Sequence, residues 1–351
     1  MAGDDRVVVQ AEPLRAFAAA LFEKVGVPPA DAALVADTLV EADLRGVHSH
    51  GIVRLDPYIP RLQAGGMRAV TEVTIIRELP ATMLVDGNNG IGQVISARAM
   101  ELAIERARSA GIGVVGVRNS NHFGAAAYYP MLAVKADMVG LLFSNASPGL
   151  APWGSITAML GNNPWAIAVP AGREFPVLLD MANSVVARGK IRLAAMAGRP
   201  IPEGWAANKR GEPTTDAQEG LEGMILPVGG YKGSGISIMW DLLAGALTGA
   251  AILDELSGPY KLDRPQGTGH LFMAINVEAF RPLDELKARV DEYARKVHDA
   301  ERAAGVDRIY LPGELEWLTK QERERSGIPL AKATIEEIRS LAEKLGVPFD
   351  R

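Results

Sequence analysis

The sequence contains no cysteine, few aromatic residues and little net charge. Without cysteine, the chain has no disulfide, thiolate nucleophile, iron–sulfur cluster or cysteine-based zinc site. This composition fits a cytoplasmic protein. Lysine and arginine number 37 against 42 acidic residues, a net charge of −5, so no overall positive field would attract nucleic acid or an anionic membrane. The 351 residues, 48% of them hydrophobic, are enough for two compact globular units.

Targeting and membrane signals are also scarce. The first residues, Met-Ala-Gly-Asp-Asp-Arg, lack the apolar core of a signal peptide. Residues 236–253 form a nearly continuous apolar run of about the minimum spanning length, with two glycines spaced like a membrane dimer motif. However, Asp241 interrupts the run and two acidic residues follow it. We therefore predict a close-packing helix, either buried or at a subunit interface, and no membrane span.

Apolar periodicity divides the chain into a helical start and a mixed α/β body. Helical spacing predicts helices over 14–25 and 34–45. From about Thr71, short β-rich runs alternate with helical segments. The predicted strands are 73–76, 82–85, 113–117, 139–143, 166–169, 177–179, 272–277 and 308–311. The other predicted segments are a helix over 94–107, a long loop over 198–213 and a charged amphipathic helix over 332–345.

Two glycine-rich turns resemble dinucleotide-binding loops. Residues 111–116 match G-x-G-x-x-G, but a helix precedes them and they form a strand themselves. Phosphate binding needs the order strand, glycines, helix, so we interpret 111–116 as a helix-to-strand turn. Residues 87–92 have the correct order but lack the third small residue and the later acidic residue, which favours a simple strand–helix turn. The sequence therefore indicates a cofactor fold other than the Rossmann type.

Several polar motifs occur in a fixed order along the chain. They are Asp43–Gly51 with Arg54, Asn119–Gly124, Gly161–Pro164, Asp180–Ser184 with Gly189-Lys190, Ile201–Trp205, Leu226–Gly233 and Leu311–Glu314. Each motif is modest alone, but the ordered set resembles the type-2 malate/L-lactate dehydrogenase family over nearly the whole chain. That family includes sulfolactate and ureidoglycolate dehydrogenases, diketogulonate reductase and reductases of cyclic imino acids.

The resemblance implies an α/β fold of non-Rossmann, nicotinamide-binding type with a mixed sheet. It also implies an N-terminal helical domain over residues 1–75, joined by C-terminal helices in 315–351. Residues 76–314 would form the α/β cofactor-binding and catalytic domain.

A 2-oxo acid reductase needs a proton donor at the carbonyl oxygen and a cation for the substrate carboxylate. His50 suits the first role, because the ordinary pKa of imidazole is about 6.5. Arg54 suits the second, because its planar fork can hold a carboxylate. A helix starting at Ser49 would place both side chains on one face. Ser49 itself can cap that helix or hydrogen-bond the imidazole.

The resemblance assigns further roles. It implies a relay of Ser49, His50 and Asp180, and makes His122 a substrate contact or an alternative acid. It implies that the cofactor, NAD or NADP, is bound by Asp180, Met181, Ala182, Lys232, Gly233, Gly313 and Glu314.

Some candidate residues have a plainer interpretation. His48 and His50 are too few for a metal site, so we predict no metal. We interpret His270 and His298 as structural, the latter on an exposed helix. Asn162, Asn183 and His48 depart from the residues common at these positions in the family, which weakens any inference about substrate or nicotinamide preference.

The leading hypothesis is reversible hydride transfer between NAD(P) and a small 2-hydroxy/2-oxo acid. One alternative is an NAD(P)H-dependent reductase of a cyclic imino acid such as piperideine- or pyrroline-2-carboxylate. From another class, a catalytically silent nucleotide-binding protein would use the fold for regulation. We expect a cytoplasmic homodimer with a small-molecule substrate and no nucleic-acid or membrane partner.

Overall fold

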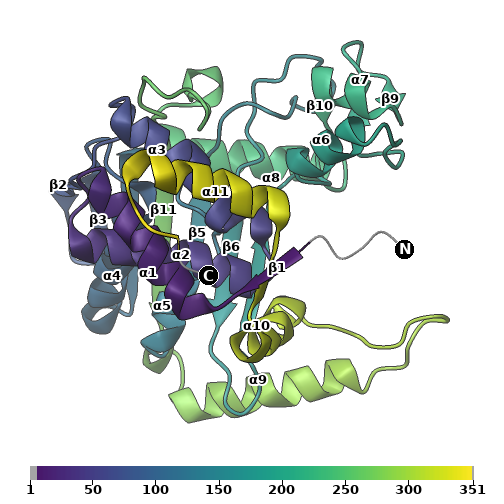
Figure 1. The fold of residues 1–351 in the computed structure, drawn as a ribbon. Coiled ribbons are helices and arrows are strands. Elements are labelled where there is room, and N and C mark those ends of the chain that lie inside the picture. The colour runs from purple at the N-terminus through teal and green to yellow at the C-terminus, as the bar shows by residue number, and fades with distance from the viewer. Residues whose placement is uncertain (1–5, 350–351) are drawn as a thin grey trace.

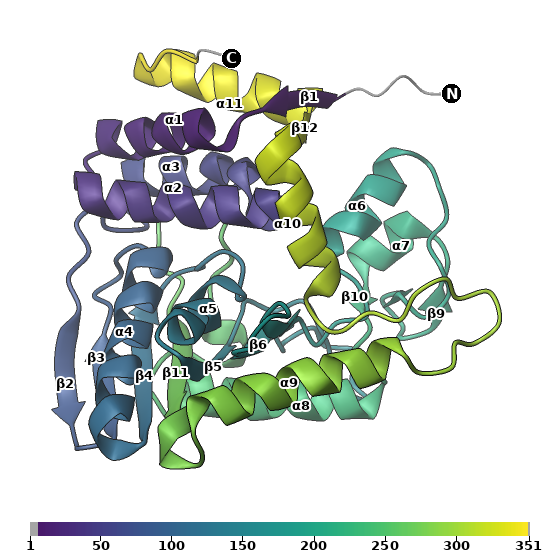
Figure 2. The ribbon, with the colours of Figure 1, turned by 90° about the horizontal axis from the view of Figure 1, so that it is seen from below.

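A computed structural model describes residues 6–349 of the chain. Three helices near the N-terminus, α1 (Ala11–Lys24), α2 (Pro29–Leu44) and α3 (Leu55–Gln63), stack at one end of the sheet with the C-terminal helix α11 (Lys332–Leu345) (Figures 1 and 2). One hydrophobic core joins α1, α2, α3 and α11, and includes Leu14, Leu39, Ile59 and Ile338. Strand β1 (Arg6–Val9) pairs antiparallel with β12 (Ile328–Ala331). The two ends of the chain thus form one layer.

A seven-stranded mixed sheet forms the centre of the molecule, in the order β2-β3-β4-β11-β5-β6-β7. Its strands are β2 (Thr74–Glu78), β3 (Thr82–Asp86), β4 (Ile112–Ser120), β5 (Met138–Ser144), β6 (Trp165–Val169), β7 (Val177–Met181) and β11 (Thr268–Asn276). Within this sheet β3 and β4 are parallel, and every other neighbouring pair is antiparallel. The prediction of a mixed, non-Rossmann sheet is therefore confirmed.

Helices cover both faces of this sheet. On one face lie α4 (Gly92–Ala110), the crossover between β3 and β4, and α5 (Tyr128–Lys135). On the other lie α8 (Tyr231–Asp241) and the π-helical turn η3 (Leu242–Ala246). The helix α4 packs so closely on β4 that a Cβ at Gly113 would collide with the carbonyl of Ala103. Gly111 ends α4 with φ +79°, so residues 111–116 are the predicted helix-to-strand turn.

A small lobe, defined here as residues 184–230, projects from the sheet and is drawn in teal in Figure 1. It contains α6 (Arg188–Met196), α7 (Ala217–Glu222) and a three-stranded sheet of β8 (Ala206–Ala207), β9 (Pro213–Thr214) and β10 (Met224–Ile225). Its core includes Ile191, Ile201 and Ala217. The predicted loop 198–213 therefore holds one short strand and the first residue of another.

Two helices complete the fold. The helix α9 (Leu283–His298) packs through Ala294 near Phe175 and Leu311. The helix α10 (Glu314–Ser326) then runs toward β12 and the N-terminal layer (Figure 2).

Two predicted elements were wrong in detail. Residues 308–311 form no strand but lead into α10, where the Leu311 amide bonds to the Glu314 carboxylate (3.0 Å). The helix expected over 236–253 begins earlier, at Tyr231, and does not continue to residue 253. The carboxylate of Asp241 accepts the Leu253 amide (3.1 Å), which turns the chain back on itself. No helix within residues 6–349 is long and apolar enough to cross a membrane.

Candidate active site

The catalytic turn, defined as residues 48–54, joins α2 to α3 and carries three predicted site residues. The expected helix starting at Ser49 is wrong, because two three-residue 3₁₀ turns, His48–His50 and Ile52–Arg54, flank Gly51 instead. Ser49 Oγ lies 2.9 Å from His50 Nδ1, so the hydroxyl contacts the imidazole rather than capping a helix. Arg54 Nε donates to the Ser49 carbonyl at 2.6 Å, which keeps the guanidinium beside the imidazole.

His122 lies two residues after the end of β4 and stacks on His50, with ring centroids 5.5 Å apart and planes 12° from parallel. The hydroxyl of buried Tyr58 lies 2.6 Å from His122 Nδ1, and the Gly124 amide donates to the same nitrogen at 3.3 Å. An N–H can only donate, so Nδ1 is the acceptor and a neutral His122 carries its proton on Nε2. Tyr58 thus fixes a tautomer that can donate from Nε2.

The protein environment favours the uncharged form of both rings. Burial first, and then the positive charge of Arg54, lower the pKa of His50 to about 3. The pKa of His122 is also lowered well below its ordinary value, by burial first and then by Arg54 and His50. Burial raises the pKa of Tyr58 to about 12, so its hydroxyl stays protonated and donates to His122.

A loop over residues 257–266 lies beside the two histidines. Gln266 accepts the His122 amide at 2.7 Å, and the Tyr260 hydroxyl lies 3.5 Å from Arg54 Nη1. Arg61, buried in α3, donates to the carbonyls of Lys261 and Arg264. The guanidinium of Arg61 therefore holds this loop against the site.

Sequence reasoning missed Tyr58, Arg61, Tyr260 and Gln266. The only available signal was the position of Tyr58, four residues after Arg54 and therefore on the same helical face. The contacts of the loop 257–266 link residues some 200 positions apart, and no local pattern marks them.

Asp180 lies at the end of β7, where its carboxylate accepts the Ala127 amide at 2.7 Å. Asp180 is exposed, yet the surrounding protein raises its pKa to about 6, by desolvation first and then by repulsion from Glu316. No hydrogen bond joins Asp180 to His50 in the described part of the chain. The Ser49–His50 contact of the predicted relay is present, whereas the link to Asp180 stays a prediction.

The predicted cofactor segments converge at the end of β7. On one side the Leu178 amide donates to Pro312 (3.1 Å), and on the other the Val228 amide donates to Asn183 (2.9 Å). A Cβ at Gly313 would clash with the Leu178 carbonyl, so only glycine allows this approach. Asp180, Met181 and Ala182 thus lie between the segment ending at Gly313 and the segment leading to Lys232.

Lys232 is exposed in the first turn of α8, two residues after Gly230. The φ angles of Gly229 and Gly230 are +60° and +64°. It pairs with no carboxylate among residues 6–349. An exposed ammonium beside glycines at a helix start suits a phosphate of a dinucleotide. A Cβ at Gly233 would collide with the Val228 carbonyl. These residues fit a nicotinamide dinucleotide.

Glu314 has a different surrounding from the one expected of a cofactor ligand. It is buried, with its carboxylate 2.8 Å from His298 Nε2, ion-paired with Arg308 and bonded to the Leu311 amide. The carboxylate therefore stabilises the start of α10 through contacts in the protein interior. His298 is accordingly a structural residue, although it is less exposed than its helix suggested.

The remaining polar candidates are structural. His270 is buried between Ser120 (2.9 Å) and Ser144 (2.8 Å), as predicted. Asn183 is fully buried and donates to the Asn163 carbonyl at 2.7 Å. This departure from the family pattern therefore lies in the protein interior and not on a surface that a ligand could contact. Within the described residues, no group of three or more histidine, aspartate or glutamate side chains could hold a metal ion.

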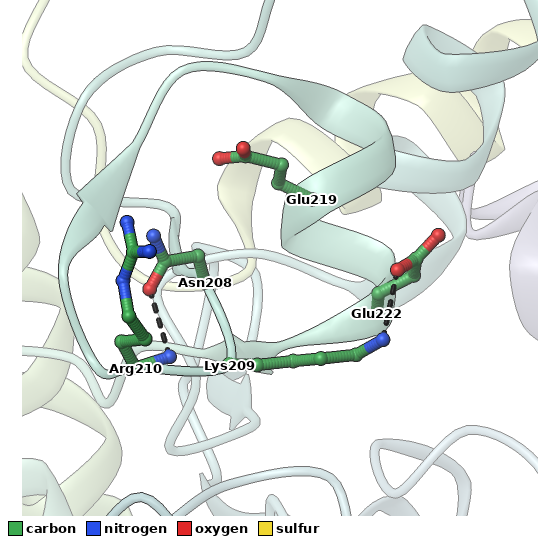
Figure 3. A pocket seen from close by; sticks show the side chains of 5 residues that line it. All are labelled: Asn208, Lys209, Arg210, Glu219 and Glu222. Carbon is green, nitrogen blue, oxygen red and sulfur yellow. Dashed lines mark hydrogen bonds and ion pairs between the residues drawn. The ribbon is translucent and has the colours of Figure 1, made fainter.

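Surface hollows lie elsewhere, in the small lobe. One of about 210 Å³ is lined by Asn208, Lys209, Arg210, Glu219 and Glu222 (Figure 3). Lys209 pairs with Glu222 at 2.9 Å, so the charges in it largely satisfy one another. A second hollow, of about 400 Å³, lies between α6 and α7. Neither hollow contains a predicted site residue.

The mixed sheet, the two stacked histidines and the neighbouring Arg54 are features that a nicotinamide-dependent dehydrogenase of hydroxy acids requires. The chain belongs to the malate/L-lactate dehydrogenase family, whose sequence model matches residues 9–339.

Known proteins resemble this chain along nearly their whole length. A malate dehydrogenase of Pyrococcus abyssi is 40% identical, covering 98% of this chain and 96% of its own. The structure of sulfolactate dehydrogenase from Methanocaldococcus jannaschii has a TM-score of 0.92 at 40% identity, covering 97% and 98% of the two chains. The structure of delta1-piperideine-2-carboxylate reductase from Pseudomonas syringae has a TM-score of 0.86 at 30% identity, covering 96% and 100%.

Proposed function

We propose that this protein reversibly reduces a small 2-oxo acid of the malate or lactate kind, with His50 as the acid/base and Arg54 as the carboxylate anchor. The observation that carries the proposal is the contact of Ser49, His50 and Arg54 within one turn, with His122 stacked on His50. The bound nicotinamide, NAD or NADP, supplies or accepts the hydride. The names of relatives that act on malate and sulfolactate support the substrate class.

The two histidines take different roles in this proposal. Both donors at His122 Nδ1 leave this residue only its Nε2–H to offer to a substrate oxygen. His50 has a hydroxyl at Nδ1 instead, and a hydroxyl can either donate or accept. The His50 ring can therefore alternate between neutral and protonated forms without losing its partner. We infer that His50 moves the proton and that His122 orients the carbonyl.

Arg54 also determines when His50 becomes an acid. Its charge is one cause of the low pKa of His50. A substrate carboxylate on the guanidinium would offset that charge and raise the pKa of His50. Binding of the anion would thus prepare His50 to hold the proton that reduction consumes.

The predicted unit of α1–α3 with the C-terminal helices supplies the catalytic turn in this proposal, and the α/β body supplies Asp180, Met181, Ala182, Lys232, Gly233 and Gly313 around the cofactor. Asp180 would complete the relay of Ser49 and His50 if substrate or cofactor brought its carboxylate closer.

A substrate panel tests the function directly. We expect oxidation of NADH or NADPH, followed by absorbance, with oxaloacetate, sulfopyruvate or pyruvate, and a much slower reaction with piperideine- or pyrroline-2-carboxylate. The likeness to a piperideine-2-carboxylate reductase makes the cyclic imino acid the second candidate. Turnover of imines alone would replace the first proposal with the second. Calorimetric binding of NADH without turnover of any compound would instead favour a silent nucleotide-binding protein.

We also propose a cytoplasmic homodimer. The absence of cysteine supports the location.

Apolar side chains are exposed along α8 and just after the turn η3, among them Tyr231 (64%), Met239 (51%) and Leu247 (66%). Such a stripe is typical of a subunit interface. Light scattering at micromolar concentration should give twice the mass of the 37.4 kDa chain. Replacement of Met239 and Leu247 by glutamate should give the monomer mass, and a monomeric natural protein would contradict the proposal.

A further inference from the structure

The catalytic turn is too short to maintain its own shape. It consists of two 3₁₀ turns of three residues each, and such turns have poor hydrogen-bond geometry. Yet it positions Ser49, His50 and Arg54, whose placement the proposed chemistry requires. Contacts from outside the turn must therefore fix it.

One buried carboxylate binds the turn on both sides of His50. Asp43, near the end of α2, is 1% exposed. Its Oδ1 lies 2.6 Å from His48 Nδ1, and its Oδ2 accepts the Ile52 amide at 2.7 Å. A Cβ at Gly51 would collide with this carboxylate, so the turn lies directly against Asp43.

A second helix extends this contact. Arg323 of α10 donates to the Asp43 carbonyl, and its Nη1 lies 2.9 Å from His48 Nε2. Because arginine can only donate, His48 Nε2 accepts and His48 Nδ1 donates its proton to Asp43. His48 thus links Arg323 to Asp43.

The other end of α10 lies on the cofactor side. The helix starts directly after Gly313, and Glu316 in its first turn is close enough to raise the pKa of Asp180. Figure 2 shows α10 running from this region to the N-terminal layer. One rigid helix therefore spans the distance between the cofactor segments and the catalytic turn.

Building on the proposed function of His50 and Arg54, we propose that Asp43 is a positioning residue of the reaction. With His48 and Arg323 it forms a clip that aligns the catalytic turn with the cofactor side of the site. The clip would act through the catalytic turn and not on substrate or cofactor directly. Its loss should slow the hydride step while leaving the binding of NADH intact.

Asp43→Asn tests the clip, because it keeps the shape of the side chain. Its NH₂ group would face either His48 Nδ1 or the Ile52 amide, both of which are donors, so one of the two hydrogen bonds is lost. We expect kcat for the preferred 2-oxo acid to fall about 100-fold, since a misplacement of about 1 Å can cost that much. The dissociation constant of NADH should be nearly unchanged. The primary isotope effect from nicotinamide deuterated at the transferred C4 position should increase, because the hydride step becomes more rate-limiting.

Asp37→Asn is the matched control. Asp37 lies on the same helix and pairs with Arg15 (2.8 Å) and the Tyr128 hydroxyl (2.7 Å), away from the turn. It should lose thermal stability without a change in isotope effect. If a folded Asp43→Asn behaves as this control does, the clip has no positioning role. If the natural protein itself turns over no substrate, the proposed function fails instead.

Variants of His48 keep the test decisive if Asp43→Asn does not fold. His48→Asn can still donate to Asp43 but no longer reaches Arg323, whereas His48→Ala loses both contacts. We expect a graded loss of kcat, smaller for His48→Asn, with the isotope effect rising in the same order. If both variants fold and have the same kcat and isotope effect as the natural protein, the proposal is overturned.

Discussion

Replacement of His50 by alanine is expected to lower kcat for reduction of the preferred 2-oxo acid by about 10²–10⁴-fold, the usual contribution of a positioned general acid. Of the two stacked histidines, the variant loses the one whose Nδ1 partner, the Ser49 hydroxyl, tolerates both protonation states. The side chain is not part of the buried hydrophobic core, so the free energy of unfolding should change little. Steady-state kinetics with NADH or NADPH, together with thermal unfolding, give both quantities.

The variant His122→Ala provides the contrast. Two donors occupy His122 Nδ1, so its loss removes a neutral N–H donor, worth about 1 kcal/mol or about fivefold in rate. Added imidazole should restore part of the activity of His50→Ala and little of that of His122→Ala. If His50→Ala kept near-natural turnover while His122→Ala was inactive, the roles of the two histidines would be reversed.

Much of the architecture could be predicted because its signals are local. Short β-rich runs located the seven strands of the central sheet to within a few residues, and helical spacing located α1, α2, α4 and α11. The strand expected over 308–311 failed because its sequence, Arg-Ile-Tyr-Leu, has β-like composition but no neighbouring strand to pair with. The helix expected over 236–253 stops at Ala246, and Gly249, with a φ of +74°, turns the chain out of the helical path.

The site shows the same division between local and long-range information. The grouping of Ser49, His50 and Arg54 followed from their spacing, although the backbone between them is not the expected helix. Tyr58 could not be identified as a partner of His122, because the two residues are 64 positions apart and Tyr58 is equally suited to a core position in α3. Asp43 was included only as part of a motif, since its proposed role depends on Arg323 of α10, 280 positions further along the chain.

Arg54→Gln is expected to lower kcat/KM for 2-oxo acids by about 10–150-fold, mostly through KM. Glutamine cannot form the charge-assisted, two-pronged contact with a carboxylate, and hydrogen bonds to charged groups are worth about 1.5–3 kcal/mol. Arg54→Lys should lie between the two, because it keeps the charge but loses the fork. Arg108→Gln, an exposed position on α4, is the control and should match the natural protein. For a substrate ester, which lacks the carboxylate charge, kcat/KM should differ little between the natural protein and the Arg54→Gln variant.

The same variant should change the pH dependence of the reverse reaction. Oxidation of a 2-hydroxy acid needs a neutral His50 to accept the proton, so activity falls as pH drops below the pKa of this group. In the free natural protein that pKa is about 3, lowered by burial first and then by Arg54, and kcat/KM should be flat on the acid side down to about pH 5. Without the guanidinium the pKa of His50 rises, so the acid limb should move to higher pH. If the acid limb lay at the same pH in both proteins, the charge of Arg54 would not influence the pKa of His50. Binding of the substrate carboxylate and transfer of the proton would then be independent of each other.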